Sequence, residues 1–408
     1  MQEDPTTTFD AVIIGAGAAG LFCAGVAGQR GLRVLVIDHA AKVAEKVRIS
    51  GGGRCNFTNR DATPAQFTGA NPAFCRSALA RYGARDFIAL VHRHGIAFHE
   101  KHKGQLFCDR SAEDLIAMLL AECAAGNVSR WQPCAVQAVR YSDGTGYEIA
   151  TDRGTVRAPR LVIATGGLSI PAIGATDFGY RIAAQFGLKL VERQPGLVPM
   201  TFDGAAWTLY GGLAGLALPV EIETGSGKAR MRFSEDLLFI HRGLSGPAVL
   251  QISSFWKPGQ PLRLNLAPGI DLTGELARAK STSQRLVANT LAAWVPQRLA
   301  DAWVQQNPAW QRPVNEAADK ALAQLAERIA RWEITPVGTE GYRKAEVTLG
   351  GVDTKELSSQ TLEARRQPGL HFIGEVVDVT GWLGGYNFQW AWSSGHACAQ
   401  AMADALGK

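Results

Sequence analysis

The pattern of hydrophobic positions near the amino terminus predicts a strand, a helix and a second strand. The run Ala11–Ile14 is apolar and rich in β-branched residues, which suits a strand buried on both faces. Small and apolar residues follow at helical spacing to about Gln29, and Gly31 stands where such a helix ends. A second apolar run, Arg33–Ile37, predicts the next strand. This segment therefore predicts a βαβ unit.

The turn after the first strand has the pattern G-x-G-x-x-G. Gly15 permits a tight turn, Gly17 lets the backbone approach a pyrophosphate, and Gly20 allows close contact between helix and strand. The helix N-terminus offers N–H groups and a positive dipole end to phosphates. Asp38, at the end of the second strand, is placed to accept hydrogen bonds from adenosine ribose hydroxyls. We interpret the unit as a dinucleotide site, with an ordinary glycine-rich turn as the alternative. The motif alone does not separate FAD from NAD.

Two later segments also run from a predicted strand into a glycine turn. The first is Leu161–Gly167. The second is His371–Glu375, followed by residues 384–387 and a helical stretch to about Ala405. The order of the three junctions resembles the FAD domain of the glutathione-reductase type, in which the chain returns at its end to complete the flavin site. The sequence therefore favours FAD and an α/β fold with a Rossmann-like FAD-binding domain.

The middle of the chain has a different pattern and predicts inserted domains. Short apolar runs broken by Gly and Pro, from about Leu190 to Pro268, predict an antiparallel β domain. Helices are then expected over Ser283–Trp294, Arg298–Val304 and Asn315–Ile329. The expected division is a FAD-binding domain over 1–190 and 351–408, a β-rich inserted domain over 191–270 and 333–350, and a small helical domain over 271–332.

Three strings make the resemblance specific. They are ISGGGRCNFTN at 49–59, FIHRGLSGP at 239–247, and the segment 374–387 that ends in GGYN. With them the chain resembles the HI0933-like flavoprotein family over nearly its whole length. This family is also known as the BaiN/RdsA or YhiN type of NAD(P)/FAD-dependent oxidoreductase. The resemblance implies a FAD-binding domain interrupted by a β-rich domain and a small helical one. Members are described as aminoacetone oxidases and as reductases of conjugated bile-acid enones.

Composition and charge limit the function classes. A chain of 408 residues with 46% hydrophobic residues can bury a sizeable core, which excludes intrinsic disorder. The 42 basic and 37 acidic residues leave a net charge of +5, too small by itself to imply nucleic acid or membrane. Between Asp271 and Lys344, ten Lys/Arg stand against eight Asp/Glu with no basic run. We therefore expect no nucleic-acid partner, although tRNA-modifying flavoproteins share the fold type.

Compartment and metal binding are also constrained. The seven cysteines include no C-x-x-C pair, which indicates free thiols in a reducing cytoplasm. The uncharged segment 11–28 is rich in Gly and Ala and follows acidic residues, so it is neither a signal peptide nor an anchor. Four histidines, at 92, 94, 99 and 102, suggest a metal site, but the intervening lysines and the lack of an acidic partner pattern favour a solvated hairpin. We expect a protein without metal or membrane; the oligomeric state is not predicted.

The candidate catalytic residues are Arg54, His241 and Tyr386. By the resemblance, Arg54 lies along the cofactor, where a guanidinium can neutralise pyrophosphate or flavin charge. A phosphate-facing loop without catalytic action is the alternative. His241 is a candidate proton donor, against the commoner buried and hydrogen-bonded histidine. Tyr386 belongs to an aromatic group that would wall a flat substrate pocket or form core. Cys55, with no partner cysteine nearby, is expected to be a small packed residue.

The last glycine turn is expected to contact the flavin. Gly384 and Gly385 would let the backbone approach the isoalloxazine edge, with Asn387 opening the final helix. Glu375 stands where related FAD domains carry an aspartate to the ribityl chain. The full set expected to hold the cofactor is Gly15, Ala16, Gly17, Ala18, Ala19, Gly20, Asp38, His39, Lys46, Ser50, Gly51, Gly52, Gly53, Arg54, Cys55, Asn56, Val136, Thr165, Gly166, Gly167, Gly374, Glu375, Asp378, Gly384, Gly385, Tyr386 and Asn387.

Together these features predict a FAD-dependent oxidoreductase with non-covalent FAD. No second G-x-G-x-x-G unit is visible, so NAD(P)H would act as a transient reductant. The expected reaction passes a hydride to a small or flat organic substrate such as a conjugated C=C bond. The alternatives are amine oxidation with dioxygen, an RNA-associated flavoprotein, and a flavin-binding regulator without turnover.

Overall fold

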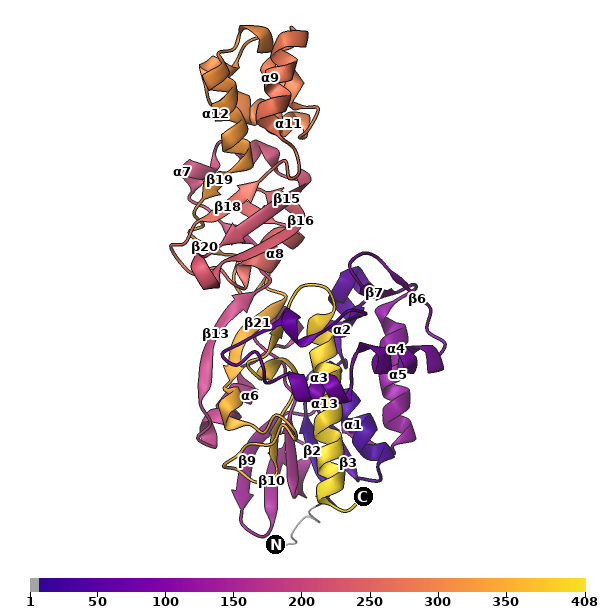
Figure 1. Cartoon of the computed structure of the whole chain (residues 1–408). Helices are drawn as coiled ribbons and strands as arrows, with labels where there is room; N and C mark the ends of the chain where they lie inside the picture. The colour runs from indigo at the N-terminus through magenta and orange to yellow at the C-terminus, as the bar shows by residue number, and fades with distance from the viewer. Residues whose placement is uncertain (1–6) are drawn as a thin grey trace. The chain divides into compact units, whose positions relative to one another are not determined.

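The βαβ unit expected at the amino terminus is present in the computed structural model, which describes residues 7–408 (Figure 1). It consists of β2 (Ala11–Ile14), α1 (Ala18–Gln29) and β3 (Val34–Ile37). The strands are parallel, with Ala11 opposite Val34. Every residue of both strands is buried, which explains why their sequences are uninterrupted apolar runs.

A five-stranded parallel sheet in the order β22-β12-β2-β3-β8 surrounds this unit. The added strands are β12 (Arg160–Ile163), β22 (Leu370–Phe372) and β8 (Ser129–Trp131). Because all five strands are parallel, their carboxyl ends lie at one edge. The strand order reverses beside β2, and in such sheets ligands bind at the carboxyl edge near this switch point. All three predicted glycine junctions therefore meet at one edge, as the fold-class prediction requires.

The chain divides into two compact units. Unit 1 contains the chain up to Gln194 together with Val347–Lys408, and unit 2 is Pro195–Glu346. In unit 1, α1 lies between α13 (Tyr386–Ala405) and α5 (Ala112–Ala125). Its small residues permit this packing, since a Cβ on Gly28 would lie 2.4 Å from the Gly126 carbonyl oxygen. The other helices of unit 1 are α2 (Glu45–Ile49), α3 (Arg76–Arg81), α4 (Ala84–Arg93) and α6 (Phe178–Gln185).

Four smaller sheets complete unit 1 and its border. One contains β1 (Thr7–Thr8), β11 (Gly154–Ala158), β10 (Gly146–Thr151) and β9 (Val136–Ser142). A second contains β4 (Asn56–Asn59), β7 (Gln105–Cys108) and β6 (Phe98–Glu100). Two strand pairs remain, β23 (Thr380–Gly381) with β5 (Phe67–Thr68), and β13 (Leu190–Gly196) with β21 (Val347–Val352).

Unit 2 contains a seven-stranded sheet whose neighbouring strands are antiparallel, as expected for the β-rich insert. In spatial order the strands are β19 (Trp332–Ile334), β18 (Leu262–Asn265), β15 (Ala217–Thr224), β16 (Met231–Ile240), β17 (Gly243–Ser245), β14 (Met200–Thr201) and β20 (Gly338–Thr339). The helices are α7 (Gly204–Trp207), α8 (Pro247–Ser253), α9 (Leu272–Thr282), α10 (Val287–Leu291), α11 (Gln297–Val304) and α12 (Asp319–Ala330). Within unit 2, α9, α11 and α12 gather at one end of the sheet (Figure 1).

The helix predictions in unit 2 need correction. The helix expected over 283–294 is only the five residues of α10, because Val287 donates its N–H to the Arg312 carbonyl and Val314 donates to that of Arg285. These bonds flank an isolated antiparallel bridge between Leu286 and Pro313, so the helix cannot begin before Val287. Helix α9 was not predicted; Asp271 begins it by accepting from the Gly274 N–H at 3.1 Å. The three-domain division stays a prediction, since the helices and the sheet belong to one compact unit.

Two expectations about the whole chain can be compared with the described residues. Within 7–408, no helix has the length and apolar character needed to cross a bilayer. All seven cysteines are buried and none is in a disulfide. Burial raises the pKa of several of these thiols, to about 12 for Cys123 and about 11 for Cys75. The thiols with a raised pKa are therefore neutral packing groups.

Candidate functional site

The three glycines of the first turn meet different surroundings. A Cβ on Gly20 would lie 1.9 Å from the Gly15 carbonyl oxygen, and one on Gly15 would lie 2.4 Å from that of Ala164. Both positions are glycine because the turn packs on itself and on the end of β12. A Cβ on Gly17 would meet nothing within 4 Å. The protein leaves open only the position that the motif reserves for the pyrophosphate.

Helix α1 presents its N-terminus to this open space. Gly17 is its N-cap, and no side chain caps the first N–H groups. These groups and the dipole end form an anion site at the start of a twelve-residue helix. Ala18 and Ala19 stand in this first turn, while the Ala16 N–H is taken by Asp38 Oδ2 at 2.6 Å. The observed cradle fits a dinucleotide pyrophosphate.

Asp38 holds the adjoining backbone with both carboxylate oxygens. Oδ2 accepts from Ala16, and Oδ1 accepts from the Ala40 N–H at 2.8 Å. Each oxygen retains a lone pair that could accept from a ribose hydroxyl. The Cys134 N–H donates to the Asp38 carbonyl at 2.7 Å, which brings the start of β9 and Val136 to this corner. His39 lies beside it, with Nδ1 3.7 Å from Asp38 Oδ1.

A second polar group joins four segments that are distant in sequence, at residues 46, 169, 348 and 375. Lys46 Nζ lies 2.5 Å from Glu375 Oε2 and 2.6 Å from Ser169 Oγ. Glu375 Oε1 accepts from the Thr348 N–H at 2.9 Å and from Ser169 Oγ at 3.2 Å. A Cβ on Gly167 would lie 2.6 Å from the same Oε1. Lys46 and Glu375 were predicted separately; the structure joins them and adds Ser169 and Thr348, for which no motif gave a signal.

At the turns after β12 and β22, the groups available to a cofactor are mainly main-chain groups rather than side chains. The Thr165 hydroxyl is buried without a partner among the described residues and faces α6, 2.3 Å from where a Gly179 Cβ would lie. Gly166 has φ +72° with nothing within 4 Å of an added Cβ. Gly374 has φ +71°, with Ala19 beside it, and donates to Ser394 Oγ at 3.0 Å. Any cofactor contact at these positions is therefore through the main chain.

The SGGGRC segment makes a tight turn in η1 (Ser50–Gly53), where Ser50 Oγ donates to the Val47 carbonyl at 2.8 Å. Gly52 and Gly53 have φ +67° and +84°, and an added Cβ would meet nothing within 4 Å at either. A Cβ on Gly51 would instead press on the Phe107 ring at 2.9 Å. Arg54 follows, exposed, and its guanidinium makes no hydrogen bond or ion pair with the residues that the structure describes. The turn thus presents a free cation next to open backbone.

Cys55 is the packed residue that the sequence indicated. It is fully buried, and its backbone takes φ +44° with its N–H bonded to the Ser50 carbonyl. Burial raises the pKa of its thiol far above the usual value. A redox or acid role is therefore unfavourable. The next residue, Asn56, places its amide beside Gly385.

The last glycine turn packs on protein. A Cβ on Gly385, where φ is +92°, would lie 2.4 Å from the Thr58 backbone, and one on Gly384 would lie 2.9 Å from the Gln105 amide. Helix α13 begins at Tyr386, whose ring stands perpendicular to Phe67 at 6.2 Å.

Asn387 was expected to open this helix. Its side chain instead closes the turn that precedes the helix. Its Oδ1 accepts from the Gly381 N–H at 2.8 Å, and its Nδ2 donates to the Gly381 carbonyl at 2.9 Å. Gly385 is the N-cap, so Asn387 is the second helical residue. The side chain therefore fixes the direction in which the chain enters α13.

Two predicted site residues lie in other surroundings. Asp378 is buried, accepts from the Ala70 N–H at 2.8 Å, and has its pKa raised by burial. Its carboxylate therefore supports the loop at 69–70. His241 is exposed in the turn between β16 and β17 of unit 2, so it is not the buried histidine of the alternative interpretation. Its catalytic role stays a prediction, as do those of Arg54 and Tyr386.

The histidine-rich segment has acidic partners that the sequence did not suggest. His94 Nε2 lies 2.6 Å from Glu122, and His99 Nδ1 lies 2.7 Å from Asp109. The sequence analysis preferred a solvated hairpin to a metal site partly because no acidic partners were apparent. That reason was wrong, since two of the histidines have such partners. Within residues 7–408, no group of three or more His, Cys, Asp or Glu is arranged to hold a metal ion. These pairs are separate surface contacts.

Comparisons with known proteins agree with this geometry. The model of the HI0933-like protein Rossmann domain matches residues 9–401. The chain is 51% identical over 395 residues to the ribosomal RNA dihydrouridine synthase of Escherichia coli, covering 97% of this chain and 98% of that protein. It is 27% identical to the 3-dehydro-bile acid delta(4,6)-reductase of Clostridium scindens, covering 96% and 98%. Among solved structures, a variant of the E. coli quinol fumarate reductase FrdA shares the fold, with TM-score 0.53, 14% identity, and coverage of 99% of this chain and 71% of that one.

These comparisons bear on the expected partners. The E. coli relative is named for a modification of ribosomal RNA, so the expectation of no nucleic-acid partner is not supported. That expectation rested on the small net charge and on charge counts over 271–344. A net charge averages over the whole surface and does not report local clusters of cations.

Proposed function

Because the chain belongs to the HI0933-like family and is a FAD-dependent oxidoreductase, we propose that it reduces a uridine of ribosomal RNA to dihydrouridine. The observation that carries the proposal is the 51% identity to the E. coli synthase along 97% of this chain. The match covers 97% of this chain and therefore extends through both units.

The chemistry of two relatives supports a reduction. Dihydrouridine forms when the C5=C6 bond of uridine, conjugated to the C4 carbonyl, gains a hydride at C6 and a proton at C5. The bile-acid relative is named as a delta(4,6)-reductase, which also acts on C=C bonds. Both names favour reduction of an electron-poor double bond over amine oxidation by dioxygen. Bound FAD, reduced by NAD(P)H, would supply the hydride.

The residues of this chain would hold the cofactor from several sides. The N-terminus of α1 would bind the pyrophosphate, and Asp38 would accept from the ribose. Lys46 and Glu375, already bonded to each other, fix the positions of the β12 and β22 junctions. The free guanidinium of Arg54 would neutralise an anionic group of the cofactor or the substrate.

The proton for C5 needs a donor other than Cys55. A fully buried thiol with a raised pKa has no path to the substrate and little tendency to give up its proton. Tyr386 and His241 stay the candidates, with solvent as the third source. The variants Tyr386→Phe and His241→Gln would distinguish these sources, because loss of the proton donor should slow the reduction of uridine without releasing FAD.

The test uses the purified holoprotein with an unmodified ribosomal RNA transcript and either NADPH or NADH, under anaerobic conditions. We expect flavin bleaching, and then dihydrouridine detected by mass spectrometry as nucleosides heavier by two hydrogens. Gly17→Val protein, which should lack FAD, is the matched control. Flavin that is reduced and stays reduced in the presence of the RNA, with no dihydrouridine formed, would overturn the proposal.

A further inference from the structure

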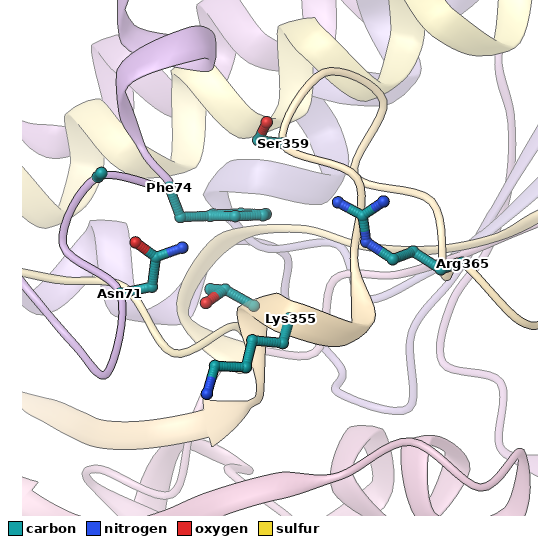
Figure 2. Close-up of a pocket in the computed structure, with 7 residues that line it drawn as sticks. Asn71, Phe74, Lys355, Ser359 and Arg365 are labelled. Atoms are coloured by element: carbon teal, nitrogen blue, oxygen red, sulfur yellow. The ribbon is translucent and has the colours of Figure 1, made fainter.

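A polar pocket opens on unit 1 outside the residues assigned to the cofactor. Its volume is about 390 Å³, and Figure 2 shows its lining. Two segments build it: the loop before α3, and the stretch that follows β21 from η8 (Thr354–Glu356) onward. The lining residues are Asn71, Ala73, Phe74, Thr354, Lys355, Ser359 and Arg365.

The rim of the pocket is held by backbone bonds. Arg365 donates its backbone N–H to the Glu356 carbonyl at 2.8 Å. This bond holds the backbone of Arg365 close to that of Lys355, the residue before Glu356. Leu357 and Ala364 form an antiparallel bridge between them. The Arg81 guanidinium donates to the Gln360 carbonyl and anchors the tip of this loop. A ligand would therefore meet a shape already formed.

The charge of the pocket is positive. Lys355 and Arg365 are exposed, and neither side chain has a hydrogen bond or ion pair within the described part of the chain. No lining residue carries a carboxylate. The nearest acids in sequence have other partners than the two cationic side chains. Asp353 accepts from the backbone N–H of Lys355 at 2.9 Å, Glu356 is buried 4.0 Å from Arg366, and Glu363 accepts from the Gly369 N–H at 2.6 Å.

Polar groups on the wall add to this charge. The Thr354 hydroxyl belongs to a residue that is 2% exposed, and it has no hydrogen-bond partner among the described residues. A buried hydroxyl without a partner is uncommon and needs an acceptor. Figure 2 shows the Arg365 guanidinium and the Asn71 amide on opposite sides of the Phe74 ring. The two cations, the Asn71 amide and the hydroxyls of Thr354 and Ser359 are all groups that can donate to phosphate oxygens.

We propose that this pocket binds a backbone phosphate of the RNA on which the protein acts. The proposal rests on the proposed function, because it assigns to that substrate a contact away from the reacting base. Phosphate contacts supply affinity and register, whereas chemistry at the base needs the flavin. The free cations of the pocket explain how a chain with little net charge can hold a polyanion locally.

The test compares three proteins with full FAD content: the parent, Lys355→Ala/Arg365→Ala, and the matched control Arg85→Ala/Arg140→Ala. The control removes two exposed arginines of unit 1 that do not line the pocket. Binding of the ribosomal RNA transcript is measured with oxidised protein and no reductant, over a series of salt concentrations. We expect the pocket variant to bind about tenfold more weakly. The slope of log Kd against log salt should fall by about one. The control should change neither.

A second variant, Thr354→Val, keeps the side-chain volume and removes the hydroxyl. It should weaken RNA binding while leaving the salt slope at the parental value, because no charge is lost. Flavin reduction by NADPH should be unchanged in every variant. If the pocket variant instead has a higher KM for NADPH and binds RNA normally, the pocket binds a phosphate of NADPH, and the RNA assignment is wrong.

The outcomes separate this proposal from the proposed function. Dihydrouridine formation together with parental RNA binding by the pocket variant would overturn the pocket assignment alone. RNA binding that depends on Lys355 and Arg365, without any dihydrouridine, would overturn the function and leave the RNA contact. A parent protein that neither binds nor modifies the RNA would overturn both.

Discussion

The first and the last glycine turns of unit 1 look alike in sequence and differ in structure. In the first turn, the Cβ position of Gly17 is open for at least 4 Å. In the last turn, the Cβ position of Gly385 is 2.4 Å from the Thr58 backbone. One glycine leaves space for a ligand, and the other lets two parts of the chain touch. A glycine in a nucleotide motif therefore has two physical meanings, which only the surroundings distinguish.

The difference also changes what a substitution would measure. A side chain at Gly17 would enter the space reserved for the cofactor, while the backbone there, with φ −84°, accepts any residue. A side chain at Gly385 would need φ +92° and would strike backbone. The first change should affect binding with the fold preserved, and the second should affect the fold first.

The largest effect is expected for Gly385→Ala. The strained backbone and the contact with Thr58 should together cost roughly 3 kcal/mol or more in the free energy of unfolding. The matched control is Gly52→Ala, which also has positive φ but meets nothing within 4 Å, and should cost about 1 kcal/mol. Urea unfolding of both FAD-free variants, followed by tryptophan fluorescence, measures the difference. Equal losses in the two variants would mean that the contact with Thr58 is relieved without cost.

The next effect is on cofactor affinity, in Gly17→Val. The FAD-free protein should keep the parental thermal midpoint, because no protein atom lies within 4 Å of the added Cβ. FAD should bind roughly 100-fold more weakly, about 2.7 kcal/mol, because the branched side chain occupies the pyrophosphate position. Titration of the FAD-free protein with FAD gives the dissociation constant. Normal FAD affinity would show that the pyrophosphate does not lie at the N-terminus of α1.

The two turns also show which features of the site could be predicted from the sequence. The first turn was predictable because a strand, a helix, three glycines and Asp38 form one local pattern within residues 11–38. The Lys46 bonds to Ser169 and Glu375 join residues 123 and 329 positions apart, and no local pattern encodes such contacts. The role of Gly385 likewise depends on β4, far away in the chain. The motif indicated that glycine matters there, but not which neighbour requires it.

The smallest effect concerns the adenosine end of the first turn and tests whether Asp38 acts on the ligand or on the turn. Asp38→Ala removes the acceptor of the Ala16 and Ala40 N–H groups as well as the expected ribose contact, and should weaken FAD binding by about 2 kcal/mol. Asp38→Asn keeps one acceptor oxygen and nearly the same shape. If the carboxylate mainly binds the ribose, Asn should retain part of the affinity, with the thermal midpoint of the FAD-free protein unchanged. If it mainly orders the turn, both variants should lower that midpoint in proportion to the lost affinity. An unchanged dissociation constant in Asp38→Ala would place the ribose elsewhere along the carboxyl edge of the sheet.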